Sequence, residues 1–176
     1  MATAGVRKLL DNEISVGLNV VLTKTSWVDL EDYVDFVQQH FEGVASVTFS
    51  WVAPLGRARK RRDLIPSMAE VAPYLARALS KSEAYGLNPS IPGRCGVPFC
   101  ILPGMQRFFV DYIEHGHGML ENAGLENPED DKVGRTKLPI CSDCLYNEMC
   151  RGIWKGYAEI FGVEEFKAVE KTGDSE

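Results

Sequence analysis

Three of the five cysteines in this chain lie within ten residues, at Cys141, Cys144 and Cys150. Two thiols separated by two residues can both turn inward from one tight loop, and we expect the third to close the site from the start of the following helix. Soft thiolates in this arrangement suit zinc or an iron–sulfur cluster, and either is normally completed by four ligands. The sequence offers two candidates for the fourth ligand, Cys95 and Cys100.

Other uses of these cysteines fit the sequence less well. A CxxC pair is also found in redox dithiols, but a third cysteine so close behind favours a metal site. Disulfides are disfavoured because the cysteine count is odd and the first twenty residues do not resemble a secretory signal. Unligated cysteines buried in a core are a further alternative.

Composition limits the classes of function. With 176 residues, 45% of them hydrophobic, the chain can bury the core of one domain or one and a half. A net charge of −6 argues against a general nucleic-acid binder. No apolar run reaches the roughly 20 residues of a membrane-spanning helix. Together with the free thiols, these features predict a cytoplasmic protein.

The first ninety residues alternate between helix and strand patterns. The run over residues 14–22 is mostly apolar and rich in β-branched residues, which is typical of a strand covered on both faces. Both longer helices begin at capping-box sequences, Ser26 to Asp29 and Ser67 to Glu70. The predicted helices cover residues 3–11, 30–41 and 68–84, and the predicted strands cover residues 14–22, 46–52 and 87–91.

Alternating strands and helices imply parallel strands with right-handed crossovers. Functional loops then follow the strands, at residues 23–26, 53–62 and 92–100, and the last of these contains both upstream cysteines. A sheet of only three parallel strands would leave a long apolar edge unpaired. We therefore expect further βα units before residue 1, or a second chain that supplies them.

After Cys100 the pattern changes. Residues 107–114 predict a strand or hairpin arm, and residues 121–135 predict a polar loop. A helix is expected from Cys150 to Phe161, ended by Gly162, before a polar tail.

Four segments are informative when they are taken together, in their order along the chain. They are Val16 to Thr23, Pro54 to Ala58, Gly96 to Cys100, and Cys141 to Cys150 with the Arg-Gly pair that follows it. Together they resemble the C-terminal part of a radical S-adenosylmethionine (radical SAM) protein with a SPASM- or twitch-type auxiliary cluster domain. The likeness runs through most of the chain, and the CxxC-x5-C core is its most specific part.

The resemblance implies an α/β fold in which residues 1–92 are the C-terminal portion of an incomplete parallel (βα)6 barrel. A small cysteine-rich α+β domain would follow over residues 93–165, then a tail over 166–176. A [4Fe–4S] auxiliary cluster would be held by four cysteines, with Cys95 as an alternative ligand. Those four are Cys100, Cys141, Cys144 and Cys150.

Two departures limit the resemblance. Trp154 stands where the full SPASM pattern has a further cysteine, which argues for a single cluster. The CxxxCxxC signature of the catalytic cluster is absent, so the chain is not expected to cleave S-adenosylmethionine alone. The implied partners are the barrel half that carries that signature and a peptide or small-molecule substrate. The alternatives are a zinc-binding structural or interaction module with the same cysteines, and a single-cluster electron-transfer protein.

Other side chains are weaker candidates. The basic run over residues 57–62 suits contact with a substrate carboxylate or peptide, but a solvated loop is the favoured interpretation. A polar turn is likewise favoured over metal ligation for His115 and His117. Phe99, Trp154 and Tyr157 are candidates for an apolar surround of the metal, although each is more simply a core aromatic.

Overall fold

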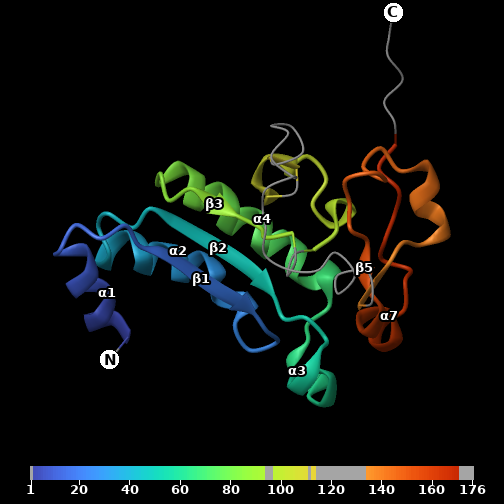
Figure 1. Cartoon of the computed structure of the whole chain (residues 1–176), viewed down its shortest axis with the longest axis horizontal. Helices are drawn as coiled ribbons and strands as arrows, with labels where there is room; N and C mark the ends of the chain where they lie inside the picture. Colours follow the sequence, from blue (N-terminus) through green and yellow to red (C-terminus); the bar gives the residue numbers. More distant parts are fainter. Residues whose placement is uncertain (1, 94–96, 111, 114–133, 171–176) are drawn as a thin grey trace, which may run out of the picture.

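The computed structural model describes residues 2–93, 97–110, 112–113 and 134–170. Within these ranges the chain is mixed α/β, with a three-stranded parallel sheet and a two-stranded antiparallel sheet (Figure 1). The helices are α1 (Ala2–Leu10), α2 (Leu30–His40), α3 (Gly56–Lys60), α4 (Met68–Ala84) and α7 (Lys155–Phe161). The strands are β1 (Gly17–Leu22), β2 (Ser46–Trp51), β3 (Pro89–Ser90), β4 (Arg135–Thr136) and β5 (Ile153–Trp154). Short 3-10 helices are η1 (Trp27–Asp29), η2 (Arg62–Leu64), η3 (Phe99–Ile101), η4 (Gln106–Phe108) and η6 (Pro139–Asp143).

The parallel sheet has the strand order β1-β2-β3, so β2 is central. β1 pairs with β2 along its whole length, and β3 pairs with β2 over two residues. The predicted alternation of helices and parallel strands is confirmed. The third strand is shorter than the predicted range, because Asn88 has a positive φ of 41° and Ile91 pairs instead with Phe109.

The core lies between the sheet and helices α2 and α4, which contact each other and cover one face of the sheet (Figure 1). Alternate residues of β2 are buried there, as a half-covered strand requires. The apolar residues that recur at helical spacing in the two predicted helices face this core, and all but the half-buried Tyr33 are fully covered. The covered residues are Leu30, Val34, Val37, Phe41, Met68, Val71, Leu75 and Leu79. No helix in the described ranges is long and apolar enough to cross a membrane.

The other face of the sheet is polar, so the prediction that the first strand is covered on both faces is wrong. The exposed positions of β1 alternate with less exposed ones, and Val21 remains 44% exposed. Ser50 Oγ donates a hydrogen bond to Asn19 Oδ1 at 2.6 Å, and the hydroxyls of Thr48 and Ser90 lie 3.0 Å apart. The run from Val20 to Leu22 hides this alternation in the sequence, because adjacent apolar residues point to opposite faces.

One of the two predicted helix caps forms. Ser67 Oγ accepts a hydrogen bond from the backbone N–H of Glu70 at 3.3 Å. The cap predicted at Ser26 is wrong, because this hydroxyl bonds within the loop after β1 and donates to the carbonyl of Val21 at 3.0 Å. α2 begins only at Leu30, after η1.

Three predictions in the second half also need correction. Residues 106–108 form η4 instead of a strand, and the consecutive residues Phe108 and Phe109 are both buried, which a one-sided strand does not allow. The predicted helix at Cys150 starts only at Lys155, after β5. Arg135, which the sequence predicts to lie in a loop, belongs to β4. Residue 114, residues 121–133 and the tail at 171–176 lie outside the described residues.

Tyr157 joins the C-terminal part of the chain to the sheet and to α4. Its side chain is fully buried, and its ring lies against Trp51 with 6.1 Å between ring centroids. Its hydroxyl accepts a hydrogen bond from the backbone N–H of Met68 at 2.6 Å and donates one to the carboxylate of Glu165. That carboxylate also accepts from the N–H of Ala69 at 2.7 Å. Burial, and then the carboxylate of Glu165, raise the pKa of Tyr157, so the phenol keeps its proton.

We expect Tyr157→Phe to lower the free energy of unfolding by about 1–3 kcal/mol, because it leaves a buried N–H and a carboxylate without their partner. Tyr85→Phe is the matched control, since the hydroxyl of Tyr85 bonds Asp35 at an exposed site and its loss should cost little. Urea unfolding followed by circular dichroism measures both. Equal stabilities of the two variants would contradict the role given to Tyr157.

Candidate metal centre

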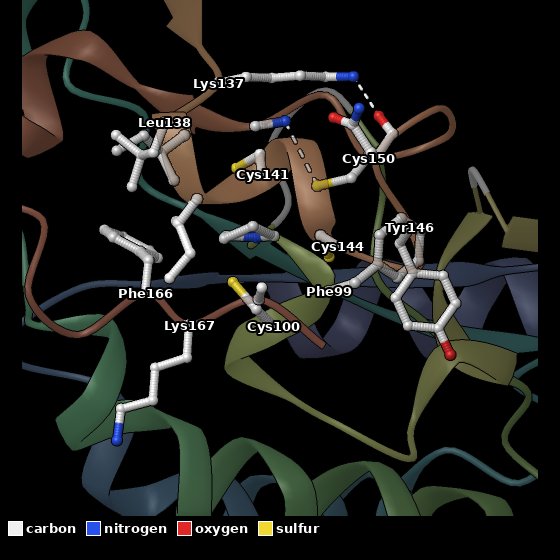
Figure 2. Close-up of a pocket in the computed structure, with 16 residues that line it drawn as sticks. Phe99, Cys100, Lys137, Leu138, Cys141, Cys144, Tyr146, Cys150, Phe166 and Lys167 are labelled. Atoms are coloured by element: carbon white, nitrogen blue, oxygen red, sulfur yellow. Dashed lines mark hydrogen bonds between the residues drawn. The ribbon is translucent and has the colours of Figure 1, made fainter. Parts of the chain in front are cut away.

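Four cysteines from separate turns of the chain line one pocket (Figure 2). Cys100 belongs to η3, Cys141 belongs to η6, Cys144 ends η6, and Cys150 lies in the turn before β5. All four are free thiols around a space of roughly 430 Å³, counted out to its open mouth. The structure therefore brings together the four predicted ligands, whereas Cys95 lies outside the described residues.

Two successive turns place the three C-terminal cysteines. Pro139 opens η6, and the N–H of Cys144 then donates to the carbonyl of Cys141 at 3.2 Å. The next turn closes when the N–H of Cys150 donates to the carbonyl of Tyr146 at 2.8 Å. The tight CxxC loop is thus confirmed, but the third cysteine is held by a turn instead of by a helix start.

Backbone N–H groups point at three of the sulfurs. Gly152 donates to Cys150 Sγ at 3.4 Å, and Val169 donates to Cys144 Sγ at 3.5 Å. The N–H of Lys167 likewise faces Cys100. Such N–H groups favour thiolate over thiol, and around bound metals they orient the ligands and set the reduction potential.

The pocket raises the pKa of two thiols, those of Cys100 and Cys150. Burial, and then a negative charge on Cys150, raise the pKa of Cys100 to about 12. Burial also raises the pKa of Cys150, although the N–H groups of Gly152 and Phe99 act in the opposite direction. Four thiolates therefore need a compensating cation at neutral pH, and binding of a metal here must release protons.

The walls of the pocket are mainly apolar. Phe99, Leu138 and Phe166 line it, and the ring of Phe99 also lies 5.1 Å from that of Tyr146 between centroids. Of the three aromatics predicted around the metal, only Phe99 lines the pocket. Trp154 and Tyr157 are buried in the core.

The sulfurs would be spaced differently in the two kinds of metal centre. Tetrahedral zinc with Zn–S bonds of about 2.3 Å needs sulfurs about 3.8 Å apart. In a cubane each thiolate binds a different iron, so the sulfurs would stand farther apart. Among the described residues, no group of three or more His, Cys, Asp or Glu side chains is close enough to hold a single metal ion.

Sequence reasoning missed the C-terminal strap, residues 163–169. Phe166 is 5% exposed, and Lys167 lines the pocket. The carbonyl of Val169 accepts a hydrogen bond from the N–H of Leu145 at 2.8 Å, which fastens the strap beside the CxxC turn. The sequence carries one signal for this packing, the apolar residues Phe166 and Val169 within an otherwise polar segment assigned to the tail.

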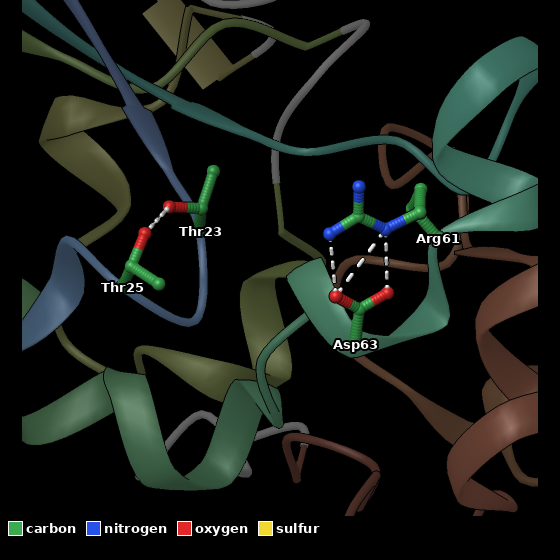
Figure 3. A network of polar contacts seen from close by, with 4 residues as sticks. All are labelled: Thr23, Thr25, Arg61 and Asp63. Carbon is green, nitrogen blue, oxygen red and sulfur yellow. Dashed lines mark hydrogen bonds and ion pairs between the residues drawn. The ribbon is translucent and has the colours of Figure 1, made fainter.

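The remaining candidates lie away from the pocket. Arg57, Arg59 and Lys60 are exposed on α3. Arg61 pairs with Asp63 at 2.8 Å, beside the loop that carries Thr23 and Thr25 (Figure 3). None of these side chains lines the cysteine pocket, and His115 and His117 lie outside the described residues.

No family model, curated protein or solved structure matches the chain.

We expect Gly152→Ala to disrupt the centre. Gly152 has φ +79°, and an added Cβ would overlap the carbonyl oxygen of Thr136, so the turn that aims its N–H at Cys150 must shift. Gly86→Ala is the control, because Gly86 also has a positive φ of +71° but open space around it. Metal content after anaerobic reconstitution should fall in the Gly152 variant and stay at the wild-type value in the Gly86 variant. Full metal content in both would contradict this role.

Removal of the strap should also abolish metal retention. A chain that ends at Gly162 loses the N–H groups that face Cys100 and Cys144, whereas a chain that ends at Glu170 keeps them. We expect the shorter chain to lose bound metal to a chelator at least 10-fold faster, the lower end of the range for loss of partners around metal ligands. Equal rates for the two chains would show that the strap has no part in the centre.

Proposed function

We propose that this chain binds one [4Fe–4S] cluster through Cys100, Cys141, Cys144 and Cys150. The observation that carries the proposal is the convergence of these four thiols on one pocket with mainly apolar walls. Backbone N–H donors to three of the sulfurs support thiolate ligands at this site.

We further propose that the chain is the C-terminal part of a radical SAM protein of the SPASM or twitch type. The parallel βα units and the cysteine spacing support this, because the C-terminal end of β2 and the loop after it pack against the cysteine-rich part. Trp51 at that end contacts Tyr157, and an added Cβ at Gly156 would lie 3.2 Å from Pro54. The exposed β1 edge supports pairing with further strands of a partial barrel.

In this function the cluster, when bound, accepts or donates single electrons or ligates the substrate. The residues of this chain do the rest. Phe99, Leu138 and Phe166 limit the access of water, and the N–H groups of Gly152, Lys167 and Val169 stabilise the thiolates. Cleavage of S-adenosylmethionine is assigned to a barrel half with the CxxxCxxC signature, and the substrate to a peptide or small molecule.

Zinc bound by the same cysteines is the second candidate, since thiolates are also its preferred ligands. It would make the chain a structural or interaction module. A single-cluster electron-transfer protein is the third, and it shares the cluster but has no use for βα units that end at the metal centre.

Anaerobic purification with iron, sulfide and zinc analysis separates these candidates. We expect brown protein with about four irons and four sulfides per chain. Cys144→Ala and Cys150→Ala should lose most of both, and Cys95→Ala should keep them. Colourless protein with one zinc would replace the cluster with the structural module, and full iron in Cys150→Ala would refute the ligand set.

A further inference from the structure

A buried arginine lies behind the metal centre, on the strand that pairs with β5. Arg135 of β4 is 7% exposed and sits opposite Trp154 in the antiparallel pair. Its guanidinium lies over the indole, with 4.4 Å between Cζ and the ring centroid. A buried, permanently charged side chain is costly unless the fold uses its charge or its hydrogen bonds.

The hydrogen bonds of Arg135 join two segments that are distant in sequence, one that precedes Cys100 and one that follows Cys150. Nη2 donates to the carbonyl of Gly93, in the segment that leads to Cys100, at 2.8 Å. Nη1 lies 3.5 Å from the carbonyl of Gly152, whose own N–H donates to Cys150 Sγ. One planar guanidinium thus faces both the approach to Cys100 and the turn after Cys150.

The positive charge of Arg135 can also offset negative charge on the four cysteines. Four thiolates carry four negative charges, and either Zn²⁺ or a doubly charged cubane offsets only two of them. A guanidinium stays protonated at any accessible pH, and in a buried setting its charge is weakly screened. Arg135 therefore adds a fixed positive charge next to the turn that carries Cys150.

We propose that Arg135 is a positioning residue of the metal centre, which fixes Cys100 and Cys150 relative to each other and offsets the negative charge of their thiolates. The proposal rests on the proposed function, because it needs a metal bound by the four cysteines. It adds a residue that the cysteine pattern does not indicate, and it predicts effects on both metal affinity and reduction potential.

The test uses the full chain, reconstituted anaerobically with ferrous iron and sulfide and, in a parallel sample, with Zn²⁺ alone. Arg135→Met removes the charge and the planar N–H donors of the guanidinium but keeps a long side chain. Arg135→Lys keeps the charge without the planar guanidinium. Arg77→Met is the matched control, because Arg77 also lies over an aromatic ring, that of Tyr74 at 4.6 Å, but on the exposed side of α4.

We expect Arg135→Met to bind metal 10- to 100-fold more weakly in chelator competition, the range found for residues that support metal ligands. Its cluster should also have a lower midpoint potential, because the reduced, more negative state loses a nearby positive charge. Arg135→Lys should restore the potential but not the full affinity, and Arg77→Met should change neither.

Wild-type affinity and potential in a folded Arg135→Met variant would overturn the proposal. Lower stability of metal-free Arg135→Met with unchanged affinity and potential would also overturn it, since that describes a purely structural residue. If Arg135→Met does not fold, Arg135→Lys decides, and full affinity in that variant refutes the bridging role. A wild-type chain that binds neither iron–sulfide nor Zn²⁺ overturns the proposed function itself, an outcome distinct from the failure of Arg135 alone.

Discussion

The buried hydroxyl of Tyr157 and the carboxylate of Glu165 hold the C-terminal part of the chain against the N-terminus of α4. The first N–H groups of a helix have no partners within it, and here side chains from a distant segment supply them. α7 follows directly on β5, and β5 follows the turn that carries Cys150. The geometry of the metal centre therefore depends on how well this contact fixes the C-terminal part on the sheet.

The centre itself is built from local turns and distant supports. Two tight turns, closed by hydrogen bonds within residues 138–150, bring Cys141, Cys144 and Cys150 to the pocket. Cys100 joins them from η3, and the strap supplies N–H groups to Cys100 and Cys144. This division explains why a short cysteine pattern predicts residues that line the pocket, whereas the electrostatic surroundings of these residues become visible only in three dimensions.

The sequence predicted helices and strands correctly where a local pattern could form only one set of hydrogen bonds. α4 begins at Ser67 as predicted because the hydroxyl and the backbone N–H that it caps lie within one turn. The same pattern at Ser26 failed because the loop after β1 offers that hydroxyl nearer carbonyls. The strand or hairpin arm predicted over residues 107–114 does not form at Phe108 and Phe109, because packing buries both of these adjacent side chains.

The sequence alone determined the alternation of helices and parallel strands and the turns that carry Cys141, Cys144 and Cys150, because both depend on spacing between near neighbours. Only the tertiary structure decided that one face of the sheet is polar and open, that the strap lines the cysteine pocket, and that Arg135 is buried against Trp154 beside the turn after Cys150. These features come from contacts between residues far apart in the chain, which periodicity does not encode. Propensity and spacing act over a few residues, whereas burial and hydrogen bonding depend on which distant segments pack together.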